Sequence, residues 1–137
     1  MYETGVVYLA GAGTGNPALI TCRCREVLER AYNDAAGVTA EINRNILRVV
    51  NGAVDADFDP GAFRHVAFYD EGESRIEMHL AAESAQTVRL GSLGATISVK
   101  AGETIWTESS YKFTRDSTAE MLEAAGLTLE EWHTDGL

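Results

Sequence analysis

The period of hydrophobic residues changes near residue 52, and this change constrains the fold more than any other feature of the sequence. Before it, apolar residues recur every three or four positions, as at Val38, Ile42 and Ile46, which is typical of an amphipathic helix. After it, apolar and polar residues alternate, most regularly over Arg75–Leu80, as along a strand with one buried face. Helices followed by strands predict an α+β fold.

Turn and capping residues mark the expected elements. Asn33-Asp34 is expected to end a first helix and cap a second, and Asn51-Gly52 to end the second. The predicted helices cover 18–33, 35–51, a short turn at 60–63, and 118–125 with Ser117 as cap; the predicted strands cover 5–10, 64–69, 75–80, 86–90, 95–100, 104–113 and 127–133. The expected architecture is a strand and two helices leading into a mostly antiparallel sheet with one further helix.

Length and charge narrow the classes of function. The chain has 137 residues, enough for one domain with a core and too few for two ordinary ones. Acidic residues outnumber basic ones 21 to 11, and the net charge of −10 argues against nucleic acid and anionic membranes as partners. No apolar run reaches about 18 residues, and the first residues do not resemble a signal peptide, so a cytoplasmic protein is expected.

Metal chemistry is not expected. The chain has few thiols and imidazoles: Cys22, Cys24, His65, His79 and His133. Their spacing matches no zinc site, and the cysteines are expected to be reduced. The acidic run Asp55–Pro60 lacks the remaining ligands of a calcium loop. It is expected to be a solvated loop that caps the short helix at 60–63.

Two stretches contain candidate binding residues. On the strand predicted at Thr104–Phe113, alternation puts Trp106, Glu108 and Ser110 on one face within about 7 Å, which suits a small polar ligand with N–H groups. An amphipathic edge strand with a chance glutamate is the alternative. In Gly11-Ala-Gly-Thr-Gly-Asn16, backbone N–H groups can approach a ligand closely. The spacing is not that of a dinucleotide fingerprint, and a tight turn is the alternative.

Several sequence stretches occur together and in order from about residue 27 to the end. They are Ala31-Tyr-Asn-Asp-Ala-Ala-Gly-Val-Thr39 with Asn43-Arg-Asn45, Phe58-Asp-Pro60 with Phe63-Arg-His-Val-Ala67, Arg75-Ile-Glu-Met-His-Leu80, Gln86-Thr-Val88, Gly102-Glu-Thr-Ile-Trp-Thr-Glu-Ser-Ser-Tyr-Lys-Phe113, and Gly126-Leu127 with Trp132 and Thr134-Asp135. Together they resemble the ergothioneine-pathway L-histidine Nα-methyltransferases, whose methyl donor is S-adenosylmethionine.

The resemblance implies roles for individual residues. It implies that Glu108 and Ser110 bind the imidazole of the substrate, that Tyr32 holds its carboxylate, and that Met78 packs near the ring. A carboxylate and a hydroxyl can each satisfy one ring nitrogen, and a thioether suits an aromatic ring. Core packing is the alternative for Tyr32 and Met78. No catalytic side chain is implied, because methyl transfer to an amine depends mainly on proximity and orientation.

The glycine-rich stretch resembles two families. It aligns with the G-S-T-x-G-N loop of the histidine methyltransferases, which implies that Asn16 contacts the substrate amine and that Gly11 and Gly13 lie at the cofactor. Residues 7–21 also resemble the opening of uroporphyrinogen-III C-methyltransferases, with Thr14 and Asn16 where those carry Pro and Asp.

The resemblance also bears on domain organisation. The family binds its cofactor on a doubly wound sheet, and this chain lacks most of that sheet. Residues 1–51 are therefore expected to be a remnant of the Rossmann-like domain with connecting helices. Residues 52–137 are expected to form an antiparallel substrate-recognition region, packed with the remnant as one unit.

Two functions stay open. One is S-adenosylmethionine-dependent methylation of the α-amino group of histidine; the other is a non-catalytic remnant that binds a ligand or self-associates. Whether the chain alone is an enzyme is left open. A homo-oligomer or a partner chain is expected, because the missing sheet would expose apolar surface around Val6–Leu9 and the Val38, Ile42, Ile46 stripe.

Overall fold

The computed structural model describes residues 22–133, which form helices and antiparallel strands. The elements are α1 (Cys22–Tyr32), α2 (Val38–Val54), the 3-10 turn η2 (Pro60–Ala62), β1 (Phe63–Asp70), β2 (Arg75–Ala82), β3 (Gln86–Leu90), the 3-10 turn η3 (Gly91–Leu93), β4 (Ala95–Val99), β5 (Thr104–Tyr111) and α3 (Arg115–Ala124). The predicted α+β class is confirmed. The strand predicted at 5–10, the glycine-rich turn and the first residues of the first helix lie outside the described residues.

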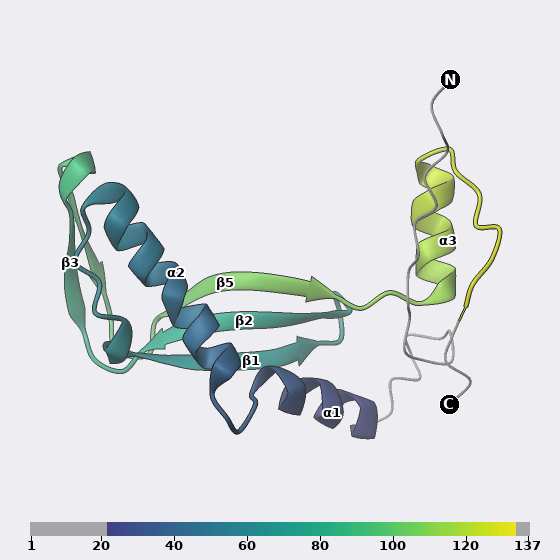
Figure 1. The fold of residues 1–137 in the computed structure, drawn as a ribbon, viewed down its shortest axis with the longest axis horizontal. Coiled ribbons are helices and arrows are strands. Elements are labelled where there is room, and N and C mark those ends of the chain that lie inside the picture. The colour runs from purple at the N-terminus through teal and green to yellow at the C-terminus, as the bar shows by residue number, and fades with distance from the viewer. Residues whose placement is uncertain (1–21, 134–137) are drawn as a thin grey trace.

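The strands form two sheets, where the sequence predicts one. β1, β2 and β5 make a three-stranded antiparallel sheet in the order β1-β2-β5, and β3 pairs with β4 in a separate antiparallel ribbon. Figure 1 shows the ribbon at one end of the three-stranded sheet, with α2 crossing from β1 towards β3 and α1 lying along β1. α3 lies beyond the end of β5, away from both sheets (Figure 1).

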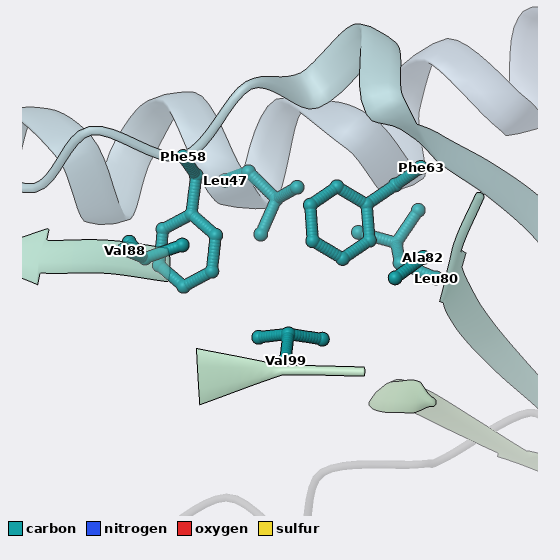
Figure 2. Packing of buried hydrophobic residues seen from close by; sticks show 7 residues of the cluster. All are labelled: Leu47, Phe58, Phe63, Leu80, Ala82, Val88 and Val99. Carbon is teal, nitrogen blue, oxygen red and sulfur yellow. The ribbon is translucent and has the colours of Figure 1, made fainter. Parts of the chain in front are cut away.

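A hydrophobic cluster joins the two sheets beneath α2 (Figure 2). Its buried members are Leu47, Phe58, Phe63, Leu80, Ala82, Val88 and Val99. They come from α2, from the chain that follows it and from strands of both sheets. Complete burial of one large apolar side chain contributes about 1.5–3 kcal/mol, so this cluster holds the ribbon, the sheet and α2 together.

A second cluster packs α1 onto the other half of the sheet. Ala67, Tyr69, Ile76 and Met78 are buried here, and Leu28 and Tyr32 of α1 pack against them. The two clusters lie along the same side of the sheet, because directly opposite residues of antiparallel strands point to the same face.

The start of α2 confirms one prediction and corrects another. The Asp34 carboxylate accepts hydrogen bonds from the N–H groups of Val38 and Thr39, both at 2.9 Å, so Asp34 binds the first turn as predicted, although the N-cap residue itself is Gly37. The helix begins at Val38 instead of Ala35 because Gly37 is in the left-handed region with φ 73°.

The predicted end of α2 at Asn51-Gly52 is wrong, since the helix continues to Val54. The Asn51 side chain bonds both the N–H and the C=O of Phe58, at 2.9 and 2.7 Å. It thus anchors the following loop instead of ending the helix. The helix ends at Asp55, which has a left-handed φ of 50°.

The acidic loop after α2 is folded as expected. The Asp59 carboxylate accepts from the N–H of Gly61 at 2.9 Å and caps η2. Asp55 and Asp57 instead bind the Arg89 side chain and backbone N–H. Within residues 22–133 no group of three or more His, Cys, Asp or Glu side chains gathers as a metal site.

Two predictions at the C-terminal end are wrong. Thr114 caps α3, and Ser117 reciprocates from within the first turn by bonding the backbone N–H of Thr114. The segment 127–133 forms no strand. No helix within residues 22–133 is long and apolar enough to cross a membrane.

Candidate ligand-binding site

A β-bulge determines which side chains of β5 share a face. Glu108 lies opposite Met78, but Trp106 lies opposite His79, and Thr107 between them has no partner on β2. Met78 and His79 point to opposite faces of β2, so Trp106 and Glu108 do too. The prediction that Trp106 shares a face with Glu108 and Ser110 is therefore wrong, because one extra residue reverses the alternation.

We call the two sides of the three-stranded sheet the helix face and the ladder face. The helix face contains Ile76, Met78 and Leu80 of β2 and is covered by α1 and α2; Glu108 and Ser110 belong to it. The ladder face is the opposite side, with Phe68, Arg75, Glu77, His79, Trp106 and Tyr111.

Three polar groups meet at the end of the helix face where α1 stops. The Tyr32 hydroxyl lies 2.7 Å from Ser110 Oγ. The ammonium of Lys112 donates to both oxygens, each at 2.8 Å. All three side chains are half-buried. The structure thus brings together Tyr32 and Ser110, which the sequence proposed as binding residues, and adds Lys112.

Glu108 and Met78 flank this triad. The Glu108 side chain is exposed, while Met78 is only 4% exposed and belongs to the hydrophobic cluster under α1. Glu108 and Ser110 are two residues apart on one strand, about 7 Å along it. The carboxylate of Glu108 and the hydroxyl of Ser110 can therefore contact opposite ends of one small ring.

Opposing effects act on the Tyr32 phenol. Burial alone would raise the pKa of Tyr32, but hydrogen bonds from Lys112 and Ser110, together with the Lys112 charge, lower it overall. The negative charge of Glu108 acts in the opposite direction and raises this pKa. Glu108 is therefore close enough for its charge to influence the phenol.

Contacts between β1 and the two helices before it hold Tyr32 in place; we call them the edge contacts, because β1 is an outer strand of the order β1-β2-β5. The Asn33 amide pairs with both backbone groups of Ala67, at 2.9 and 3.3 Å. His65 Nε2 donates to the carbonyl of Tyr32 at 2.9 Å, and His65 Nδ1 accepts from Asn43 Nδ2 at 2.9 Å. A carbonyl can only accept, so these contacts fix the tautomer of His65.

Sequence reasoning missed Lys112 and these edge contacts. The signal for Lys112 is its spacing, because a residue two positions after Ser110 returns to the same face of an extended chain. The edge contacts join residues more than 20 positions apart and give no local signal. Asn16, Gly11 and Gly13 lie outside the described residues.

The ladder face is covered by its own side chains. Phe68, His79 and Trp106 stack in sequence, with ring centroids 5.4 and 5.9 Å apart. The Arg75 guanidinium lies over Trp106 and donates two hydrogen bonds to one oxygen of Glu77, whose other oxygen accepts from His79. Hydrogen bonds from His79 and Arg75 lower the pKa of Glu77.

The described fold and site define a class: an antiparallel sheet with a buried core behind one face and, at the rim of that face, a set of groups suited to a small polar ligand. Residues 12–136 match the family described as "Histidine-specific methyltransferase, SAM-dependent". The chain belongs to this family.

Two curated relatives support this assignment. The chain is 49% identical over 108 residues to a histidine N-alpha-methyltransferase of Mycobacterium tuberculosis (strain CDC 1551 / Oshkosh). It is 50% identical over 108 residues to a histidine N-alpha-methyltransferase of Mycolicibacterium smegmatis (strain ATCC 700084 / mc(2)155). Each match covers 79% of this chain and 34% of the relative, so the chain spans about a third of the length of these relatives.

Proposed function

We propose that this chain carries the substrate-recognition part of a methyltransferase that acts on the α-amino group of L-histidine. The observation that carries the proposal is the convergence of Tyr32, Ser110 and Glu108 on one face of one sheet. The family match and the names of the two relatives agree with it.

The chemistry of the site suits a neutral imidazole. A neutral imidazole has one N–H donor and one acceptor nitrogen. The Glu108 carboxylate accepts from the donor, and a hydroxyl of the Tyr32–Ser110 pair donates to the other nitrogen. Met78 supplies a polarisable wall behind the ring. We retain Asn16 as a contact to the amine, as the family resemblance implies, and we place Tyr32 at the ring, paired with Ser110, in preference to the carboxylate contact that the resemblance also implies.

The family is S-adenosylmethionine-dependent, and this cofactor supplies the electrophilic methyl group when bound. All strand pairs within residues 22–133 are antiparallel, so this part of the chain does not form the parallel sheet edge on which a doubly wound domain binds a nucleotide. We assign cofactor contacts to Gly11 and Gly13, with the sheet supplied by a partner chain or a longer polypeptide. In this proposal residues 1–51 are a Rossmann-like remnant and 52–137 the substrate-recognition region.

Calorimetric titration of the chain with histidine tests the ring contacts. Ser110→Ala removes a hydroxyl from the helix face, and Ser109→Ala removes one from the ladder face one residue away. We expect Ser110→Ala and Glu108→Gln to weaken histidine binding about tenfold, the effect of one unsatisfied hydrogen bond. Ser109→Ala should leave binding unchanged. Equal effects of the two serine substitutions, or no binding by the unmodified chain, would contradict the proposal.

Addition of S-adenosylmethionine to the same titration distinguishes an enzyme from a binding module. Methylated histidine detected by mass spectrometry would make the chain an enzyme on its own. Histidine binding without methyl transfer would leave recognition as its role. We propose a cytoplasmic location and a place in ergothioneine biosynthesis on the resemblance alone.

The surface of α2 favours a second candidate, self-association. Val38, Ile42 and Val49 are 58%, 62% and 61% exposed and lie along one side of the helix. We propose a second copy of this chain as the occupant, since an exposed apolar stripe of this kind promotes self-association.

Light scattering over a range of protein concentrations tests this candidate. Ile42→Lys should shift a dimer to the monomer, because it buries a charge in the proposed interface. Val27→Lys is the matched control, since Val27 is 57% exposed on α1 outside the stripe. A monomer at all concentrations, or the same shift from Val27→Lys, would rule out dimerisation through this stripe.

A further inference from the structure

Lys112 extends β5 and turns its side chain back onto the helix face. Its backbone N–H donates to the carbonyl of Ser74 at 2.8 Å, which prolongs the pairing with the β2 side. Its ammonium lies 2.8 Å from both Tyr32 Oη and Ser110 Oγ, and these two oxygens lie 2.7 Å apart. The three groups therefore form a closed triangle.

The triangle fixes the direction of its hydrogen bonds. An ammonium group has three protons and no lone pair, so Lys112 donates to Tyr32 and to Ser110 and accepts from neither. The bond between the two hydroxyls uses one of their two protons. One hydroxyl proton is left over, and it cannot point at Lys112. The hydroxyl pair therefore presents a hydrogen-bond donor to a ligand.

We propose that Lys112 is a positioning residue that makes the Tyr32–Ser110 pair a donor to one ring nitrogen of the ligand, while Glu108 accepts from the other. This rests on the proposed function, and it adds that the site selects one tautomer of a neutral imidazole. Without the ammonium, each hydroxyl can rotate and either donate or accept, so the selection is lost.

Paired ligands separate this role from a purely structural one. Histidine has ring nitrogens, whereas 3-(2-thienyl)alanine has a ring of similar size without them. Lys112→Met should weaken histidine binding about tenfold and thienylalanine binding by less than about threefold, because only histidine loses a directed hydrogen bond. Lys112→Arg keeps the cationic donor and should recover part of the histidine affinity. Lys100→Met, an exposed lysine at the end of β4, is the control and should change neither.

The bound state gives a second readout. With ¹⁵N-labelled histidine, the unmodified chain should show the ring-nitrogen shifts of a single tautomer, and Lys112→Met should show the average of two. An equal loss of affinity for both ligands would make Lys112 structural only, and an unchanged affinity for histidine would remove any role. Either result overturns the proposal.

A titration without ligand keeps the inference testable if Lys112→Met binds nothing or if the unmodified chain does not bind histidine. Lys112 stabilises the phenolate by donating a hydrogen bond to it, so Lys112→Met should raise the pKa of Tyr32. The titration is measured by the absorbance of the phenolate, and Tyr32→Phe identifies which part of the signal comes from Tyr32. No rise would overturn the triangle. No histidine binding together with a rise would reject the proposed function while supporting the contacts of Lys112.

Discussion

The helix face and the ladder face consist of the same three strands but exclude water in different ways. On the helix face, Ile76, Met78 and Leu80 are buried beneath α1 and α2. On the ladder face, Glu77 is 7% exposed although no described helix packs over it, since Arg75 and the aromatic rings cover it. Burial of apolar side chains excludes water from the helix face, whereas on the ladder face paired charges lie under aromatic rings that keep water away from them.

The difference explains why we place the proposed ligand on the helix face. On the ladder face both carboxylate oxygens of Glu77 are already bonded, to Arg75 and to His79. On the helix face the Glu108 carboxylate is exposed at the rim of a packed core, beside the triangle of Tyr32, Ser110 and Lys112. Groups that are available yet rigidly supported are the ones that can hold a ligand in one orientation.

The largest expected effect comes from inserting one alanine between Met78 and His79 of β2, which would give Thr107 a partner and break the distinction between the faces. Without the bulge, regular alternation would put Trp106 and Glu108 on the same face. Either the large indole enters the helix face, or Glu108 and Ser110 leave it. We expect loss of histidine binding and a severe loss of stability, measured by calorimetry and urea unfolding. Thr107→Ala removes only the hydroxyl bond to the Met78 carbonyl, so it is the control that keeps the bulge.

Full retention of stability and binding after the insertion would mean that the bulge does not separate the two faces. The tryptophan spectrum provides a further check. Trp106 donates its N–H to the backbone carbonyl of Glu108 and stacks on His79. A variant in which the indole has moved to the other face should show a changed emission maximum.

The sequence predicts local structure well and face assignment poorly. Alternation over Arg75–Leu80 and the turn at 70–74 place β2 and the first hairpin correctly, since both depend on neighbouring residues. The bulge at Thr107 depends on pairing with a strand about 30 positions earlier, and no residue near Thr107 signals it. The partition into two sheets depends likewise on a core assembled from distant segments.

The candidate site likewise has a part that the sequence predicts and a part that only the folded chain shows. The strand pattern and the family resemblance identify Glu108 and Ser110, and the structure adds that Tyr32 touches Ser110 across 78 positions of sequence. Lys112 shares the spacing of that strand, yet only the folded chain shows its ammonium turned back on both hydroxyls.

A smaller effect should distinguish the two faces by how much the truncation of one side chain lowers the free energy of unfolding. Ile76 on the helix face is fully buried, so Ile76→Ala should destabilise the fold by about 3 kcal/mol through lost burial and the cavity left behind. Phe68 on the ladder face is 39% exposed, and water can refill its place. In urea unfolding, Phe68→Ala should therefore lower the free energy of unfolding by less than Ile76→Ala does, although phenylalanine is the larger side chain. Equal losses would show that the ladder face is a core like the other.

The smallest effect concerns the charges of the ladder face and depends on pH. The pKa of Glu77 is lowered in the folded state by bonds from His79 and Arg75, so its contribution to stability is complete above the unfolded pKa of about 4.3 and is lost as pH falls through the folded pKa. Glu77→Gln keeps the shape and one acceptor. In urea unfolding, the free energy of unfolding of this variant should be clearly lower than that of the unmodified chain at neutral pH. The difference should shrink in acid. Glu83→Gln, an exposed glutamate, is the control and should show no such trend. A deficit independent of pH would mean that packing of Glu77, and not its charge, supports this face.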